Sequence, residues 1–482
     1  MKTGTQPSPL LSESARGRWG LRRIFKSAVA WGFLAAFLRA GSSLIILPLL
    51  VHRVSSEELG VWYLFGAIAG ALGVLDIGFS TNVARAAACA WAGAPRLLPF
   101  GLAGLGSTPA EFSPPNRPLL AQLAASMDIF YRRAALAGAL LLLVCAGPGI
   151  WTKTSILPHA TALRAALPAF LLATGVNVWA NLWLALLSAI HQVHRVQHLF
   201  IVGLVCNYSV CCASLLANLG IWSMVLGNLS MGLALAILGR RDFFARSGIQ
   251  HVPSTPAARM EILRTIWPNA WRAGVLHVAT YLILSGNVLM SGIFLSLRET
   301  GSYGLTFQIV MMIVQVSGVW MQVKLPVFNQ LRAQGRLEEL ALVFTARLRL
   351  CLGTYLLGGC GLLLLGPFAL SLIGSKTPLL PLPMLSVLLI FVLLQMNHSQ
   401  YEALVLTENR NPFMVPYLTS GVIIVALGLC LIPTLGLWGL LLSATLVQAC
   451  YNNWWPILRA IQGLNYSPAR YFRLFFFNKN AL

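Results

Sequence analysis

Twelve apolar stretches, each long enough to cross a bilayer, constrain this chain more than any other feature. They cover approximately residues 28–51, 60–84, 133–151, 166–190, 199–219, 221–239, 270–295, 302–323, 349–373, 379–405, 413–432 and 435–457. A helix of roughly 20 apolar residues spans a hydrocarbon core of about 30 Å. The pattern therefore predicts an all-α polytopic membrane protein with about 12 transmembrane helices. A chain of 482 residues with 57% hydrophobic and only 10% charged residues is hard to reconcile with a soluble protein.

The basic residues orient these stretches. Nearly all of the 34 Lys and Arg residues lie in the two tails or in the even-numbered gaps between stretches. The odd-numbered gaps hold only Arg53, Lys153, Arg164, Arg298 and Lys376, and one further residue, Arg39, lies inside the first stretch. Because cytoplasmic loops carry an excess of Lys and Arg, both termini are predicted to be cytoplasmic.

Charge and cysteine usage exclude several other classes. The net charge of +21 is spread beside the ends of the stretches, so attraction to anionic membrane lipid explains it and nucleic-acid binding is not predicted. The nine cysteines show no paired spacing in any loop, which indicates neither a metal site nor a disulfide framework. The sequence has no Walker loop, HExxH motif or nucleophile elbow. The chain is therefore predicted not to be an enzyme, and no cofactor is implied.

The chain divides into two halves of six stretches. The predicted segments are a basic cytoplasmic tail at 1–27, an N-lobe at 28–239, a cytoplasmic linker at 240–269 with a short interfacial helix at 259–267, a C-lobe at 270–459 and a cytoplasmic tail at 460–482. The acidic turn before Gly60 resembles the one before Gly301, and each glycine opens an apolar stretch. Two six-helix lobes of one orientation around a central cleft are what alternating access requires. The long cytoplasmic segment 85–132 has no predicted role.

An arginine interrupts the first stretch. Arg39 lies about 11 residues into it, which is roughly 16 Å from the inner boundary at 1.5 Å per residue. An arginine at a helix centre costs at least about 2.5–3.5 kcal/mol. We therefore expect Arg39 to face a wet cavity or a partner, for which Asp76 in the second stretch is the natural candidate. Such a pair either fixes helix packing alone or forms a cationic spot for an anionic group of a substrate.

Polar residues recur at helical spacing in other stretches. His277, Tyr281 and Ser285 share one helix face, as do Gln308, Gln315 and Gln322. Side chains of these types suit a sugar-handling cavity, but amides at membrane depth also join helices with about 0.6–2 kcal/mol. Both interpretations stay open.

The fourth and tenth stretches add further candidates. Asn177 and Asn181 are one turn apart in the fourth stretch. The tenth stretch has a polar inner end that includes His398 and Glu402. These residues either contact a substrate or, in the tenth stretch, mark where the helix leaves the bilayer.

Two runs of sequence resemble a known family. Residues 47–62 read Leu-Pro-Leu-Leu-Val-His-Arg-Val-Ser-Ser-Glu-Glu-Leu-Gly-Val-Trp, and residues 75–85 read Leu-Asp-Ile-Gly-Phe-Ser-Thr-Asn-Val-Ala-Arg. They resemble the opening of Wzx-type oligosaccharide flippases and related polysaccharide exporters of the multidrug/oligosaccharidyl-lipid/polysaccharide (MOP) superfamily. The resemblance is sharpest over residues 28–95, and the motif residues that it carries over are Asp76, Gly78 and Arg85, with Gly60 in the preceding run.

The resemblance implies a flippase in the bacterial cytoplasmic membrane. Its substrate would be an undecaprenyl-pyrophosphate-linked oligosaccharide, moved to the outer leaflet for polysaccharide biosynthesis, with polysaccharide assembly proteins as partners. The cleft of the family is lined largely by the first two helices of each lobe. The substrate-cavity candidates of this chain are Arg39, Asp76, Asn177, Asn181, His277, Tyr281, Gln308 and Gln315.

Two alternatives remain at this point. One is a drug or small-metabolite antiporter of the same superfamily, coupled to protons or sodium, which needs a deeply buried acid. The other is a membrane enzyme such as a polysaccharide polymerase or a lipid-dependent glycosyltransferase. Such an enzyme needs a sizeable outer loop with catalytic residues, and the outer gaps here offer little beyond Glu57, Glu58 and Glu299.

Overall fold

The computed structural model describes residues 45–98, 114–250, 252–408 and 412–477, apart from the side chains of Leu75 and Ile77. This part of the chain is helical and contains no strand. Nine of its helices are long and apolar enough to cross a membrane, or ten if the bent pair α8–α9 counts as one span. The predicted all-α, multi-pass membrane fold is confirmed.

The helices of the first half follow the predicted stretches in order. They are α3 (Ser56–Trp91), α4 (Arg117–Thr154), α5 (Ala160–Ala189), α6 (Val193–Leu216) and α7 (Trp222–Ser247). Each extends beyond its apolar stretch at one or both ends. The first predicted stretch lies mostly outside the described residues, and residues 45–53 form its helical end.

The second half has more breaks than its hydropathy indicates. Its elements are α8 (Pro256–Leu284), α9 (Gly286–Phe294), α10 (Leu297–Gln322), α11 (Leu325–Ala333), α12 (Leu337–Ile373), α13 (Leu382–Leu406), α14 (Met414–Leu435), α15 (Leu437–Val447), the π-helix η2 (Gln448–Asn452), α16 (Trp454–Gly463) and α17 (Pro468–Phe477). The seventh predicted stretch bends by 54° between α8 and α9. The twelfth is divided into α15, η2 and α16.

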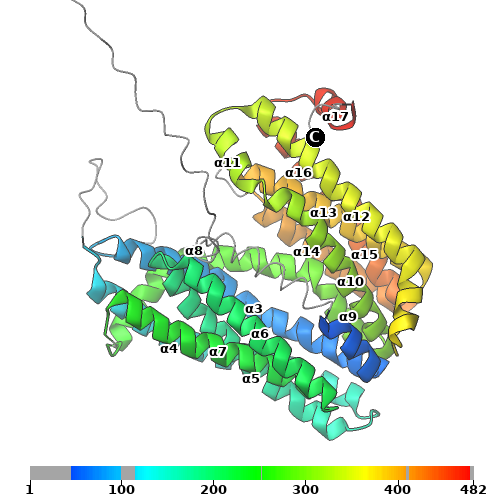
Figure 1. The fold of residues 1–482 in the computed structure, drawn as a ribbon, viewed down its shortest axis with the longest axis horizontal. Helices are drawn as coiled ribbons and strands as arrows, with labels where there is room; N and C mark the ends of the chain where they lie inside the picture. The colour runs from blue at the N-terminus through cyan, green and yellow to red at the C-terminus, as the bar shows by residue number, and fades with distance from the viewer. Residues whose placement is uncertain (1–44, 99–113, 251, 409–411, 478–482) are drawn as a thin grey trace, which may run out of the picture.

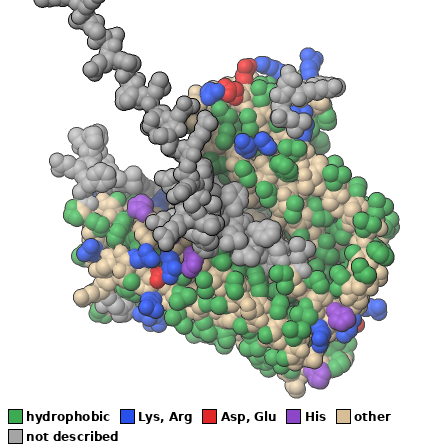
Figure 2. Space-filling view, in the orientation of Figure 1, with side chains coloured by type: hydrophobic (Ala, Val, Ile, Leu, Met, Phe, Trp, Pro, Cys, Tyr) green, Lys and Arg blue, Asp and Glu red, His purple; other side chains and the backbone are tan. Residues whose placement is uncertain are grey.

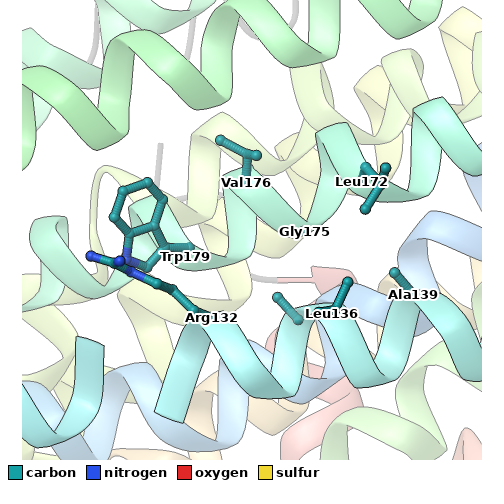
Figure 3. Close-up of a pocket in the computed structure, with 8 residues that line it drawn as sticks. Arg132, Leu136, Ala139, Leu172, Gly175, Val176 and Trp179 are labelled. Atoms are coloured by element: carbon teal, nitrogen blue, oxygen red, sulfur yellow. The ribbon is translucent and has the colours of Figure 1, made fainter. Parts of the chain in front are cut away.

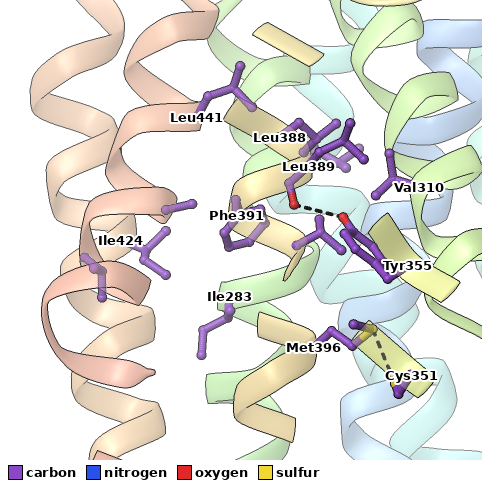
Figure 4. Close-up of a cluster of buried hydrophobic side chains, with 14 of the residues drawn as sticks. Ile283, Val310, Cys351, Tyr355, Leu388, Leu389, Phe391, Met396, Ile424 and Leu441 are labelled. Atoms are coloured by element: carbon purple, nitrogen blue, oxygen red, sulfur yellow. Dashed lines mark hydrogen bonds between the residues drawn. The ribbon is translucent and has the colours of Figure 1, made fainter. Parts of the chain in front are cut away.

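The helices form two bundles, each with its own apolar core. Helices α3 to α7 enclose one core around Phe65, Phe170 and Trp183, which we call the N-lobe core. The C-lobe core lies among α10 and α12 to α16, where Tyr355 donates a hydrogen bond to the Leu389 carbonyl at 2.9 Å (Figure 4). In Figure 1 the bundles come together near α9 and the beginning of α3, and diverge away from that point.

The charge pattern separates the two ends of the bundles. We call the end with the turns at 53–56, 155–159, 217–221, 295–297 and 374–381 the outer end, and the opposite, Arg-rich end the inner end. Apolar side chains cover the flanks of the visible face, and Lys and Arg gather toward the ends of the bundles (Figure 2). This distribution is that of a protein whose flanks contact lipid.

Helix α8 takes part in both cores. Ile262, Ile266 and Ala270 in its first half pack in the N-lobe core, whereas Ala279 and Ile283 in its second half pack in the C-lobe core. The separate interfacial helix expected at 259–267 is instead the first part of α8, which continues through Pro268. Apolar residues recur at helical spacing in this segment, so one face of a continuous helix packs against the N-lobe.

Candidate translocation site

Two equivalent turns begin the helices that meet at the outer end. Ser55 caps α3, accepting from the Glu58 amide at 3.2 Å, and Ser296 caps α10, accepting from the Glu299 amide at 3.2 Å. Each glutamate carboxylate accepts a hydrogen bond from the backbone amide of its serine, which completes a capping box. These two turns are the ones that the sequence comparison of the halves had matched.

Helices α3 and α10 touch backbone to backbone just after these turns. A Cβ atom on Gly60 would overlap the Leu297 carbonyl, and one on Gly301 would overlap the Ser56 carbonyl. Glycine permits this close approach because small residues let membrane helices pack at short distance. We call the contact of residues 55–60 with residues 296–301 the outer crossing.

Further hydrogen bonds hold the outer ends of the two halves together. Ser56 donates to the Lys376 carbonyl at 2.7 Å, and the Lys376 amide donates to the Val51 carbonyl at 2.9 Å. The Lys153 ammonium donates to the Leu295 carbonyl. The outer end is therefore closed by contacts from both lobes.

Two of the predicted cavity residues join the lobes below the outer crossing. The Tyr63 hydroxyl on α3 donates to Gln308 Oε1 on α10 at 2.6 Å. The Tyr281 hydroxyl on α8 donates to the Ala67 carbonyl on α3 at 2.8 Å. Gln308 and Tyr281 thus lie at the boundary between the lobes.

The family-like Gly78 has a similar packing role nearer the inner end. A Cβ on this residue would stand 2.6 Å from the Ala270 carbonyl oxygen and 3.0 Å from the Gly274 nitrogen on α8. The position therefore requires glycine for the contact between α3 and α8. Arg85, the last residue of the same motif, is exposed.

Asp76 is buried inside the N-lobe, with 5% of its surface exposed. Its Oδ2 atom accepts a hydrogen bond from Asn181 Nδ2 on α5 at 2.6 Å, so two residues singled out separately in the sequence meet here. Within the described residues its Oδ1 atom has no hydrogen-bond partner. The predicted partner Arg39 lies outside the described residues, and that pairing stays a prediction.

The remaining candidates are dispersed. Asn177 donates to the Asn228 carbonyl at 2.8 Å, and Asn228 donates to Thr174 at 2.9 Å, so Asn177 joins α5 to α7 inside the N-lobe. His277 is half-buried on α8, and Gln315 is exposed on α10. The structure does not bring these three residues together with Asp76.

A buried polar cluster in the C-lobe combines His398 and Glu402, which the sequence indicates, with Gln448 and Asn452, which it does not. Gln448 donates to Gln395 Oε1 at 2.5 Å, and Asn452 donates to Gln448 Oε1 at 3.1 Å. His398 donates from Nδ1 to the Asn452 carbonyl at 2.6 Å, and near it Glu402 accepts from Tyr417 at 2.5 Å. Gln448 and Asn452 belong to η2, and π-turns inside helices are frequent at functional sites. Their spacing of four residues was the available signal.

Comparison with known proteins identifies the fold. No protein-family model and no curated protein matches the sequence. Among solved structures, an inward-facing multidrug resistance transporter of the MATE family in the MOP superfamily matches with a TM-score of 0.65 and 12% identity, over 92% of this chain and 100% of that one. An outward-facing MATE transporter gives 0.51 and 13%, over 95% and 99%.

A third solved structure agrees. The MATE multidrug transporter DinF-BH matches with a TM-score of 0.60 and 14% identity, over 98% of this chain and 100% of that one. Sequence identities of 12–14% establish a shared fold but do not identify the substrate. The chain therefore has the two-lobed fold of the MATE transporters of the MOP superfamily.

Proposed function

We propose that this protein is a flippase that moves an undecaprenyl-pyrophosphate-linked oligosaccharide from the cytoplasmic to the outer leaflet by alternating access. The observation that carries the proposal is the position of the two flippase-like runs. They supply the boundary between the lobes: Gly60 lies at the outer crossing and Gly78 lies against α8. The buried Asp76 lies between these two contacts in the sequence.

The physical need for such a protein is clear. A pyrophosphate and several sugars cannot cross hydrocarbon at a useful rate, because polar groups without partners are costly there. When the lobes rock so that the outer end opens, the Tyr63–Gln308 and Tyr281–Ala67 hydrogen bonds must break. Hydroxyl and amide groups then become available to sugar hydroxyls.

A drug antiporter is the second candidate. Multidrug transporters are among the solved structures with this fold, and Asp76 is a buried acid of the kind that ion coupling needs. Coupling to protons or sodium is part of this second proposal. A polymerase has less support, because the described turns at the outer end are short.

The test is to delete the gene and measure the lipid-linked glycan pool, with an impermeant glycan label to assign the leaflet. Accumulation of complete, unpolymerised units facing the cytoplasm is the result expected of a flippase. A normal outward-facing pool, together with raised sensitivity to cationic drugs, would instead support the antiporter. A complementing plasmid with the intact gene is the control for both readouts.

A further inference from the structure

A narrow groove runs along the membrane-facing side of the N-lobe between α4 and α5. Its volume is about 160 Å³, and it is lined by Arg132, Ala135, Leu136, Ala139, Leu172, Gly175, Val176 and Trp179 (Figure 3). Leu136 and Leu172 are half exposed on its walls. The groove extends over eight residues of each helix, 132–139 and 172–179, which is seven rises of 1.5 Å or about 10 Å.

The floor of the groove is made by small residues. A Cβ on Gly175 would stand 3.5 Å from the Ala135 Cβ, so the two helices approach closely and leave a channel above their contact. The walls are aliphatic, and the groove opens toward the lipid side. A helix with side chains is about 10–12 Å wide and does not fit a volume of this size, whereas part of one hydrocarbon chain does.

At the inner end of the groove, neighbouring side chains hold an arginine in place. Asp128, buried on α4, accepts from Trp179 Nε1 at 2.6 Å and from Arg132 Nη2 at 2.6 Å and Nε at 3.1 Å. The Arg132 guanidinium lies over the Trp179 ring at 4.8 Å. Asp128 and Trp179 therefore fix the guanidinium in one orientation.

The edge of this guanidinium that does not contact Asp128 faces away from the protein. The Arg132 side chain is 51% exposed and that of Asp128 only 6%, so the charge presented at the surface is the positive one. Within the described residues Arg132 Nη1 takes part in no hydrogen bond, and the neighbouring Arg133 is exposed. Arg132 directly precedes the apolar stretch 133–151 of α4 and Arg133 begins it, which places both at the depth of the cytoplasmic headgroups.

We infer that this groove binds an acidic glycerophospholipid of the cytoplasmic leaflet. One acyl chain lies in the groove, and the phosphate contacts Nη1 of Arg132 with Arg133 beside it. Planar guanidinium groups match phosphate geometry, and each basic residue near an anionic leaflet attracts its lipid. The inference is independent of what the protein transports.

The experiment is photo-cross-linking in phosphatidylcholine nanodiscs. The full-length protein receives a trace of phosphatidylglycerol with a diazirine on one acyl chain, or phosphatidylcholine with the same chain, and labelled peptides are mapped. We expect residues 132–139 and 172–179 to be labelled by phosphatidylglycerol in preference to phosphatidylcholine. Equal labelling by the two lipids would overturn the proposal.

Variants of Arg132 test its contribution to lipid binding separately from that of the apolar groove. R132Q should lower phosphatidylglycerol labelling about fivefold, whereas R241Q, which removes an exposed arginine from the inner end of α7, should leave it unchanged. R132K keeps the positive charge beside Asp128. If the R132K protein folds and still prefers phosphatidylglycerol to phosphatidylcholine, this supports the site.

A second pair tests the acyl chain. V176W fills the groove and should abolish labelling of both segments, whereas L141W adds the same bulk on the exposed surface of α4 and should not. Undiminished labelling in V176W would refute the groove. Stronger competition by undecaprenyl phosphate than by phosphatidylglycerol would refute the assignment to a glycerophospholipid.

Discussion

Gly60→Ala tests whether the outer crossing sets the conformational equilibrium. The added methyl would overlap the Leu297 carbonyl oxygen and stand 2.8 Å from the carbonyl carbon, where ordinary contact begins at 3.4 Å. The neighbouring atoms are backbone and cannot rotate away, so α3 and α10 must separate by more than the 0.6 Å (3.4 − 2.8) that the carbonyl carbon alone requires. Overpacking of this kind costs about 1–3 kcal/mol.

This cost falls only on states in which the outer end is closed. The gain in helix propensity from glycine to alanine is common to all folded states and cancels between them. A differential of about 1–3 kcal/mol shifts a two-state equilibrium by about 5- to 150-fold. We therefore expect Gly60→Ala to favour the outward-open state strongly.

The assay is single-molecule fluorescence energy transfer between two dyes. The dyes are attached to unnatural amino acids that replace Leu219 and Leu435. These residues are exposed at the outer ends of the two lobes, and this labelling leaves the native cysteines in place. Gly73→Ala is the matched control, because a Cβ there meets no atom of the described residues within 4 Å. If the distance distribution of a folded Gly60→Ala protein equals that of Gly73→Ala, the crossing does not control the lobes.

Three further outcomes are expected. Arg39→Ala should abolish transport while the protein stays inserted, since its charge lies near the predicted midplane; normal glycan flipping by the variant would exclude a cavity role. Asp76→Asn should reduce transport less, because an amide at this position can still accept from Asn181; total loss in a correctly folded variant would favour ion coupling. Ser296→Ala should destabilise the outer end by about 1 kcal/mol through loss of the α10 cap, and an unchanged melting temperature and unchanged energy transfer would contradict this.

The order of the helices and the pairing of the two acidic turns could be predicted from the sequence. Apolar length, charge and capping residues are local properties, so they can be read from the chain. The bend at Ser285 and the π-turn at η2 could not, because hydropathy records composition and not backbone geometry.

The candidate site was anticipated only in part. Asp76 and Asn181 were each singled out, but their contact depends on how α3 packs against α5, which no spacing within one helix reveals. Asn177 was singled out for the same reasons and turned out to join α5 to α7. Gln448 and Asn452 could not be predicted, because their contacts depend on the π-turn at η2 and on the packing of η2 against α13.

The division of α8 between the two cores has a consequence for biosynthesis. Membrane proteins are made from the N-terminus, so α3 to α7 enter the bilayer before α8 exists. Until Ile262, Ile266 and Ala270 emerge, the N-lobe core lacks the residues that complete it. The first half of the molecule is therefore finished by the opening helix of the second, and a chain cut after α7 would yield two fragments that must find each other before either is fully packed.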